Sequence, residues 1–380
     1  MNKPKNEKIL NQIGYGLTSA ALIGTYSICI SAALGRGAVF ALICAVICAL
    51  FSLKGKGYIL APASLLILPL YVFTQSMPVF YCSFAILGGG IICLALNLIA
   101  KKREIPSCII TGGAIGLAIG ATIMLTNIYF SIGSFGGTAL EMLKNYRYLG
   151  FHPDFRGLLF GTITLFTMIT YPFKFRKLNK YLPAEFITIL IPFIINLLLN
   201  SDATTTTTSE YTFASARAIL STDFTTSPKI FDVMGATLAM GLIFYGFSKA
   251  KDKLFPIANM TTGALSGNAV APYPVRGYTG ISAATVIIVC SAVIFLFPSL
   301  ISRLPLPCVG AMLIVSAWQH VSFGGITSTI KEKSIVKVIA LILCAVSFII
   351  LSAPVATVLC AVLAIITSKI SSHSRREEKA

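Results

Sequence analysis

The sequence predicts an all-α polytopic membrane protein, and three observations lead to that fold class. Of its 380 residues, 56% are hydrophobic and 11% are charged, and the mean hydropathy is +0.85. A soluble domain carries about 25% charged residues, so the charged share is far too low for one. Apolar stretches close to the roughly 20 residues needed to span a bilayer recur along the whole chain. Two of these stretches are interrupted by Gly and Pro, one in each half of the chain.

The apolar segments define the expected order of spans. Thirteen or fourteen segments are expected, depending on how the broken region 254–277 is divided. An even number keeps both termini on one side, and two halves of seven related by inversion are typical of secondary transporters. The segments lie at 12–34, 37–53, 62–75, 79–100, 106–130, 156–173, 183–200, 231–248, 254–277, 278–299, 304–321, 335–351 and 354–369.

The domain boundaries follow from this order. Residues 1–200 form the first repeat, and 201–229 form a Thr-rich outside loop. Residues 230–371 form the second repeat, which is shortened around 249–280. We expect the polar end, 372–380, to be a disordered cytoplasmic tail.

The net charge of +17 reflects membrane topology rather than nucleic-acid binding. Most Lys and Arg residues gather in alternate loops, which is the positive-inside pattern. This predicts a multi-pass protein of the plasma (inner) membrane with both termini in the cytoplasm. The basic loops lie at 3–8, 54–56, 101–103, 174–180, 249–253, 331–337 and 369–379.

The two breaks are the best indication of a substrate site. The first break is Gly55–Ser64 and the second is Ser266–Gly277. In lipid an interrupted helix exposes free backbone N–H groups at the start of a half-helix. Paired breaks in the two halves are typical of transporters that bind their substrate near the bilayer midplane. Ordinary turns between helices are the alternative explanation for each break taken alone.

The sequence contains no convincing catalytic or metal-binding constellation. All ten Cys residues lie in or beside apolar segments without the spacing of metal ligands, and the three His residues are scattered. Glu185 and Asp232 lie at helix starts, where the helix dipole explains a negative charge. We therefore expect no enzyme activity, no cofactor, no metal and no acidic group at mid-depth in the membrane.

Arg276 stands apart because it lies within the second break, between Pro274 and Gly277. If that break reaches the membrane interior, Arg276 adds a positive charge near the half-helix starts, which already favour anions. If it lies at the membrane interface, its side chain only extends towards the headgroups.

Several collinear motifs resemble the SulP anion permeases, the family that includes prestin. They cover most of residues 15–370: Ala32–Gly37, Ala49–Phe51, Leu60–Pro62, Ile105–Ser107, Gly112–Gly116, Gly157–Thr162, Leu182–Pro183, Leu296–Pro298, Leu304–Pro307 and Val309–Val315. The resemblance implies a seven-plus-seven inverted-repeat fold with a core and a gate domain and two half-helices, in segments three and ten. Relatives suggest a homodimer, and we expect a shortened member of the family without its regulatory cytoplasmic STAS domain.

The resemblance also implies where the substrate binds. It places the site between the starts of segments three and ten, against segment one. The substrate-binding residues would be Thr25, Tyr26, Ala63, Ser64, Ser266, Gly267, Asn268 and Ala269, with Arg276 nearby. Two departures matter here: a second register would put Pro272–Thr279 at the second half-helix start, and the first span lacks the Pro-Gln pair of the family.

The sequence thus favours a secondary transporter of small anions such as sulfate, bicarbonate, chloride or dicarboxylates. A nucleobase or aromatic-acid permease of the same fold is the closest alternative. Such sites offer carboxylates to the ring, and none is evident at mid-depth. A non-transporting membrane protein derived from this fold is the third possibility.

Overall fold

Helices make up most of the computed structural model. It describes residues 5–36, 38–54, 58–99, 105–130, 136–149, 155–198, 230–248, 253–274, 278–296, 304–332 and 334–377. The first half contains α1 (Lys5–Ala33), α2 (Ala38–Ser52), β1 (Tyr58–Pro62), the 3-10 helix η1 (Ser64–Leu66), α3 (Ile67–Ser76), α4 (Val79–Ile99), α5 (Ser107–Tyr129), α6 (Ala139–Leu149), α7 (Phe155–Lys174), η2 (Leu178–Lys180) and α8 (Ala184–Leu198). The second half contains α10 (Ile230–Phe247), α11 (Leu254–Ser266), β2 (Val270–Pro274), α12 (Gly280–Leu296), α14 (Leu306–Gln319), α15 (Phe323–Lys331), α16 (Ile335–Ile350) and α17 (Ala353–Glu377).

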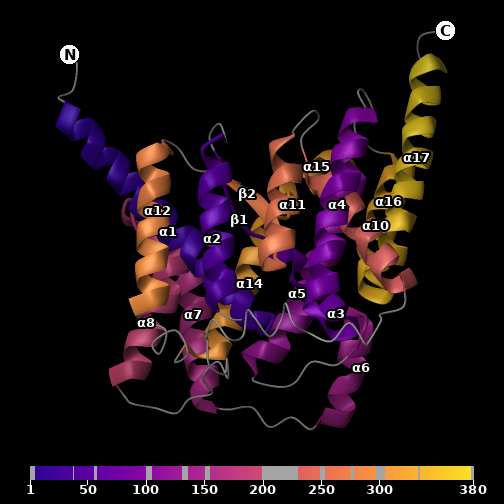
Figure 1. Cartoon of the computed structure of the whole chain (residues 1–380). Coiled ribbons are helices and arrows are strands. Elements are labelled where there is room, and N and C mark those ends of the chain that lie inside the picture. The colour runs from indigo at the N-terminus through magenta and orange to yellow at the C-terminus, as the bar shows by residue number, and fades with distance from the viewer. Residues whose placement is uncertain are drawn as a thin grey trace.

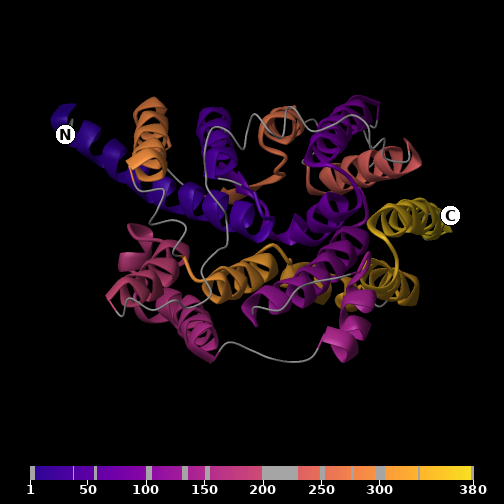
Figure 2. The same cartoon turned by 60° about the horizontal axis from the view of Figure 1, so that its bottom comes forward.

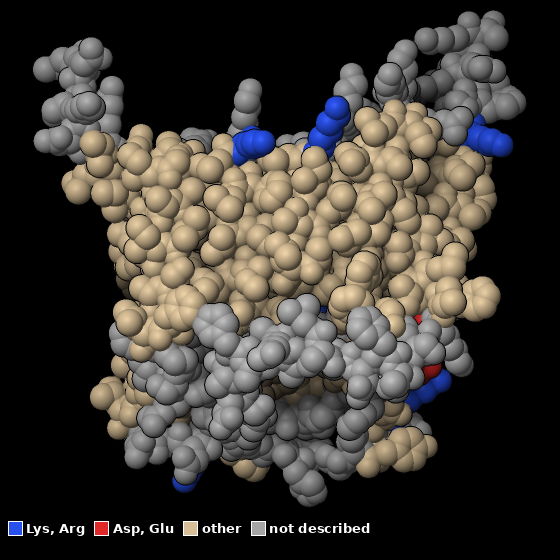
Figure 3. Space-filling model, viewed as in Figure 1, with Lys and Arg blue, Asp and Glu red and all other residues tan. Residues whose placement is uncertain are grey.

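The helices have the length and composition of membrane spans. Each predicted apolar segment contains a helix, and six helices in the described ranges are long and apolar enough to cross a bilayer. Large apolar side chains such as Phe166 and Ile288 are exposed on the outer surface, as lipid contact requires. Figure 1 shows both chain ends at the same edge of the molecule, and Figure 3 shows Lys and Arg side chains along that edge. The chain is a multi-pass integral membrane protein.

The helices form two rows that close into a ring (Figure 2). In the first row, which we call the core row, each helix packs against the next in the order α1, α12, α2, α11, α4 and α10. In the second, the gate row, the order is α8, α7, α14, α5, α16 and α17. Contacts between α1 and α8 and between α10 and α17 join the two rows.

This arrangement repeats itself between the two halves of the chain. The pairing of α1 with α12 has its counterpart in α10 with α4, and that of α7 with α14 in α16 with α5. Likewise α7 packs on α8 as α16 packs on α17. The two strands, one from each half, pair with each other in antiparallel fashion (Figure 1). The fold is the predicted inverted-repeat transporter fold.

Glycines allow close contacts between helices. A Cβ atom on Gly89 would lie 2.7 Å from Met240 Cβ of α10, and one on Gly116 would lie 2.4 Å from the Ala345 carbonyl oxygen of α16. A Cβ on Gly120 would similarly meet Leu68 of α3 at 2.5 Å. These glycines pack helices together and line no polar site.

The first break has the predicted form. β1 runs into Ala63, and the chain then turns at once into η1 and α3. The helix therefore begins inside the protein, directly at the end of a buried strand.

The second break differs from the prediction for Ser266, Gly267, Asn268 and Ala269. These residues were expected to begin a half-helix, but Ser266 is the last residue of α11, and Gly267 caps its C-terminus with φ 63°. Glycine adopts this left-handed conformation without steric cost and so ends the helix. Pro272 and Pro274 favour an extended chain, so β2 follows α11, and the next helix, α12, begins at Gly280.

The last helix is longer than the sequence suggested. α17 extends to Glu377, so most of the segment 372–380 that was expected to be disordered continues the helix. The loop 201–229 and Arg276 lie outside the described residues.

Candidate functional site

The helix start at Ser64 lies buried and lacks a side-chain cap. Ala63 occupies the N-cap position with an extended backbone, and no side chain caps the helix. Ser64, Leu65 and Leu66 are all buried. Ser, Asp or Asn usually satisfies the free N–H groups of a helix start. A buried start with an Ala cap therefore leaves a partial positive charge facing the protein interior.

Four hydroxyl groups gather at this helix start. The Ser64 Oγ lies 2.8 Å from Ser316 Oγ of α14, and Ser316 Oγ donates a hydrogen bond of 2.7 Å to the Tyr26 hydroxyl of α1. The Tyr26 ring packs against the Tyr273 ring of β2 at an angle of 36°, with centroids 4.9 Å apart. We call Tyr26, Ser64, Tyr273 and Ser316 the hydroxyl cluster. All four are buried, and they come from both halves of the chain.

His320, the residue after α14, extends this cluster. Its Nε2 atom lies 2.9 Å from the Tyr273 hydroxyl, which itself donates to the Pro62 carbonyl oxygen over 3.2 Å. The hydrogen of the Tyr273 hydroxyl thus points at the Pro62 carbonyl oxygen. The Tyr273 hydroxyl oxygen is therefore left to accept a hydrogen bond from the His320 imidazole. This contact fixes the Tyr273 ring against Tyr26.

Glu185 lies beside the hydroxyl cluster, in the interior of the protein. It is in the first turn of α8, and its side chain is buried. Its carboxyl group interacts with the Tyr26 hydroxyl and with Gln319. The sequence placed Glu185 at a helix start correctly, but nothing in its neighbourhood showed that this helix start packs on Tyr26.

Arg36 binds the helix end at the second break. Its guanidinium group, 2% exposed, donates to the Gly267 carbonyl oxygen and, over 2.9 Å, to the Asn268 Oδ1 atom. Further contacts reach the Ser266 carbonyl oxygen at 3.4 Å and Cys82 Sγ at 3.7 Å. A helix C-terminus carries a partial negative charge, so a cation is its favourable partner. Arg36 was missed because it follows the first span in sequence, far from either break.

The strand pair joins the two breaks. Pro62 pairs with Val270, and the Ala63 N–H donates to the Ala269 carbonyl oxygen over 3.0 Å. The Asn268 amide also donates to Ser31 Oγ of α1, at 3.4 Å. The structure therefore brings Ala63, Ser64 and Ala269 together, as the sequence suggested.

Two of the predicted hydroxyl side chains, those of Thr25 and Ser266, do not join the hydroxyl cluster. The Thr25 hydroxyl donates to the Ala21 carbonyl oxygen of its own helix, over 2.6 Å. Ser266 similarly donates to Thr262 within α11, over 2.8 Å. Ser316, Tyr273 and His320 were missed as site residues, because only the packing of α14 and β2 on α1 reveals them.

A cavity of about 620 Å³ lies elsewhere, between α5, α10 and α17. Its walls are mostly apolar, and it does not include the hydroxyl cluster. The described residues contain no group of three or more His, Cys, Asp or Glu side chains that could hold a metal ion.

Solved structures of anion transporters share this fold. The transmembrane domain of a cyanobacterium bicarbonate transporter, BicA, matches with a TM-score of 0.66 at 15% identity, covering 95% of this chain and 99% of that chain. The overall structure of SLC26A9 matches with a TM-score of 0.74 at 12% identity, covering 96% of this chain and 66% of that chain. The murine Slc26a9 anion transporter in the inward-facing state gives 0.68 at 13% identity, covering 97% and 70%.

These matches confirm the resemblance to the SulP permeases at the level of the fold. No family model matches the sequence, and no curated protein matches it. The chain spans about two thirds of the SLC26A9 chain and nearly all of the BicA transmembrane domain.

Proposed function

We propose that this chain is a secondary transporter of small anions, of the SulP type. The observation that carries the proposal is the buried helix start at Ser64, which has no side-chain cap and faces the hydroxyl cluster. Helix starts of this kind bind anions through backbone N–H groups and the helix dipole. The shared fold of a bicarbonate transporter and an anion transporter supports it.

The charges around the two breaks favour an anion over a cation. The Arg36 guanidinium group offsets the partial negative charge of the carbonyl groups at the end of α11. That negative charge therefore does not cancel the positive potential with which the helix start attracts an anion. Among the buried residues of the described chain, Arg36 and Glu185 carry the formal charges. The anion would accept hydrogen bonds from the backbone at Ser64 and from the hydroxyl groups of Ser64, Ser316 and Tyr26.

The position of the hydroxyl cluster suits alternating access. Tyr26 belongs to α1 of the core row, whereas Ser316 and Glu185 belong to α14 and α8 of the gate row. The Ser316–Tyr26 hydrogen bond therefore crosses the boundary between the two rows. Sliding or rocking of the core row against the gate row would break it and expose the helix start, first to one side and then to the other.

The same fold and charge pattern support three further proposals. The basic edge shown in Figure 3 faces the cytoplasm, and both termini lie there. The repeats divide at the loop 201–229. The protein forms a homodimer, as the resemblance to the SulP family implies.

A nucleobase or aromatic-acid permease is the second candidate, and Glu185 is the observation that favours it. A carboxylate beside Tyr26 would accept hydrogen bonds from ring N–H groups. The cluster offers no second carboxylate among the described buried residues.

Uptake by proteoliposomes tests both candidates. Radiolabelled sulfate, bicarbonate, chloride, succinate and uracil are offered separately to wild type and to Ser64→Ala. One or more anions should enter through the wild type, with about tenfold weaker affinity in Ser64→Ala, because one hydrogen bond to a charged group is lost.

Ser76→Ala is the matched control. Its hydroxyl lies at the other end of α3, where it donates to the Phe73 carbonyl oxygen, so its uptake should equal that of the wild type. Uptake of uracil without uptake of any anion would reverse the two candidates. If none of the five compounds enters, the chain is not a transporter of either kind.

A further inference from the structure

A chain of hydrogen-bonding groups joins the Glu185 carboxyl group to the half-helix start. Glu185 interacts with the Tyr26 hydroxyl, and Tyr26 accepts a hydrogen bond of 2.7 Å from Ser316. Ser316 in turn lies 2.8 Å from Ser64 Oγ. Three side chains thus connect α8 to the position at which the anion is proposed to bind.

The charge of Glu185 conflicts with that use of the helix start. An ionised carboxylate and a bound anion would be two like charges within one buried network, where water screens them poorly. Arg36 cannot relieve the repulsion, because its guanidinium group is held by the end of α11. Binding a proton at Glu185 removes the repulsion, and the neutral carboxyl group keeps its hydrogen bonds to Tyr26 and Gln319.

We propose that Glu185 is the proton-binding site that couples anion transport to proton transport, so that the chain is a proton–anion symporter. This inference rests on the proposed anion transport. A proton on Glu185 raises the affinity of the helix start for the anion, and the anion raises the proton affinity of Glu185 by the same factor. The two therefore bind together and cross together. Ionisable side chains inside membrane proteins commonly serve as proton carriers of this kind.

Titratable groups on the elements around α8 each have a defined partner. Tyr26 comes from α1, and Tyr273 of β2 packs against it. From α7, the Tyr171 hydroxyl donates to the Leu182 carbonyl oxygen over 3.2 Å. His320, at the end of α14, is hydrogen-bonded to Tyr273.

Proton flux measured together with anion flux tests the inference. Proteoliposomes containing a trapped pH-sensitive dye are given chloride, sulfate or succinate outside. In the wild type, anion entry should acidify the interior. An inward proton gradient of about one pH unit should raise accumulation of a monovalent anion about tenfold for one proton per anion.

Glu185→Gln keeps the hydrogen bonds of a protonated carboxyl group but has no group that can bind or release a proton near neutral pH. It should retain anion counterflow while losing both the acidification and the response to the proton gradient. Glu185→Asp should restore part of the pH response.

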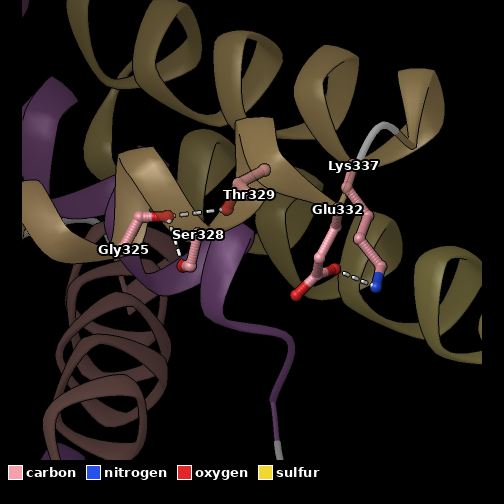
Figure 4. Close-up of polar contacts among 5 residues, drawn as sticks. All are labelled: Gly325, Ser328, Thr329, Glu332 and Lys337. Atoms are coloured by element: carbon pink, nitrogen blue, oxygen red, sulfur yellow. Dashed lines mark hydrogen bonds and ion pairs between the residues drawn. The ribbon is translucent and has the colours of Figure 1, made fainter.

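Glu332→Gln is the control, because Glu332 forms an exposed ion pair with Lys337 at 2.5 Å, outside both the cluster and α8 (Figure 4). Anion uptake, acidification and the response to the proton gradient should equal those of the wild type in Glu332→Gln.

Three results would overturn the inference. One is anion entry into wild-type vesicles without acidification. The second is an unchanged pH response in Glu185→Gln, and the third is loss of that response in His320→Gln alone. If Glu185→Gln does not fold, as judged by gel filtration in detergent, acidification in wild-type vesicles still decides whether the anion and a proton cross together. Failure of all anion uptake would instead reject the proposed function.

Discussion

The two breaks end at the same edge of the strand pair but present opposite ends of a helix. At the first break a strand precedes the helix, so the chain offers N–H groups at Ser64. At the second break the helix precedes the strand, so the chain offers the carbonyl groups of Ser266 and Gly267. One break is therefore electropositive and the other electronegative.

The difference explains why Arg36 is buried. Because β1 and β2 are antiparallel, the helix start and the helix end lie next to each other, linked by the Ala63–Ala269 hydrogen bond. Without a cation, the carbonyl end would offset the attraction of the N–H end for an anion. With the Arg36 guanidinium group on the carbonyl groups, the pair of breaks has a net positive character. Arg36 thus makes the two opposite helix ends together favour an anion.

Among the variants that test this difference, removing Arg36 should reduce the stability of the protein most. Arg36→Gln leaves carbonyl groups at the end of α11 without donors, and hydrogen bonds to charged groups are worth about 1.5–3 kcal/mol each. The relief of a buried charge offsets part of this loss. We expect a net destabilisation of about 2–4 kcal/mol, measured as a lower Tm in detergent, together with weaker anion uptake.

Lys253→Gln is the matched control for Arg36→Gln. Lys253 is exposed and occupies the N-cap position at the opposite end of α11. Exposed substitutions of this kind stay within about 0.5 kcal/mol. Equal Tm values for the two variants would show that the helix end does not need its cation.

Gly267→Ala should have the next largest effect. The left-handed conformation costs a non-glycine residue about 1–2 kcal/mol. In addition, the new Cβ would lie 2.8 Å from an Arg36 guanidinium nitrogen and 3.1 Å from its Cζ atom, which displaces the cation from the carbonyl groups. The total loss should therefore clearly exceed the backbone cost alone, again measured by Tm.

Gly35→Ala separates these two contributions. Gly35 has a similar φ of 67°, but a Cβ there would meet nothing within 4 Å. It should show the backbone cost of about 1–2 kcal/mol only. If Gly267→Ala is no worse than Gly35→Ala, the contact with Arg36 adds nothing to the stability of the second break.

Hydropathy predicted the fold well because lipid imposes a simple rule on the chain. Every span must satisfy its own backbone, so long apolar stretches become helices, and the bounds of α4 and α5 match the expected segments closely. The second break was harder, because Ser266-Gly267-Asn268 is as good at ending a helix as at preceding one. Only the pairing of β2 with β1 decides the direction of the chain there.

The site was partly predictable for a related reason. Tyr26 and Ser64 were found because they lie in the first span and at the first break, which the resemblance pairs. Ser316 and Glu185 lie outside both breaks, and they reach the site only through packing of α14 and α8 on α1. When a helix is apolar on several faces, the sequence does not predict which of its side chains point towards the site.

Thr25→Val should have the smallest effect, and it sharpens the comparison within α1 itself. Thr25 and Tyr26 are neighbours, and both were expected to face the substrate. Only Tyr26 reaches the hydroxyl cluster, whereas the Thr25 hydroxyl bonds to Ala21 within its own helix. Losing such an intrahelical bond changes stability by no more than about 0.5 kcal/mol. Anion uptake should stay within about twofold of wild type in Thr25→Val and fall about tenfold in Ser316→Ala, which loses a hydroxyl at the helix start. A marked loss in Thr25→Val would mean that the first span turns a different face to the anion during transport.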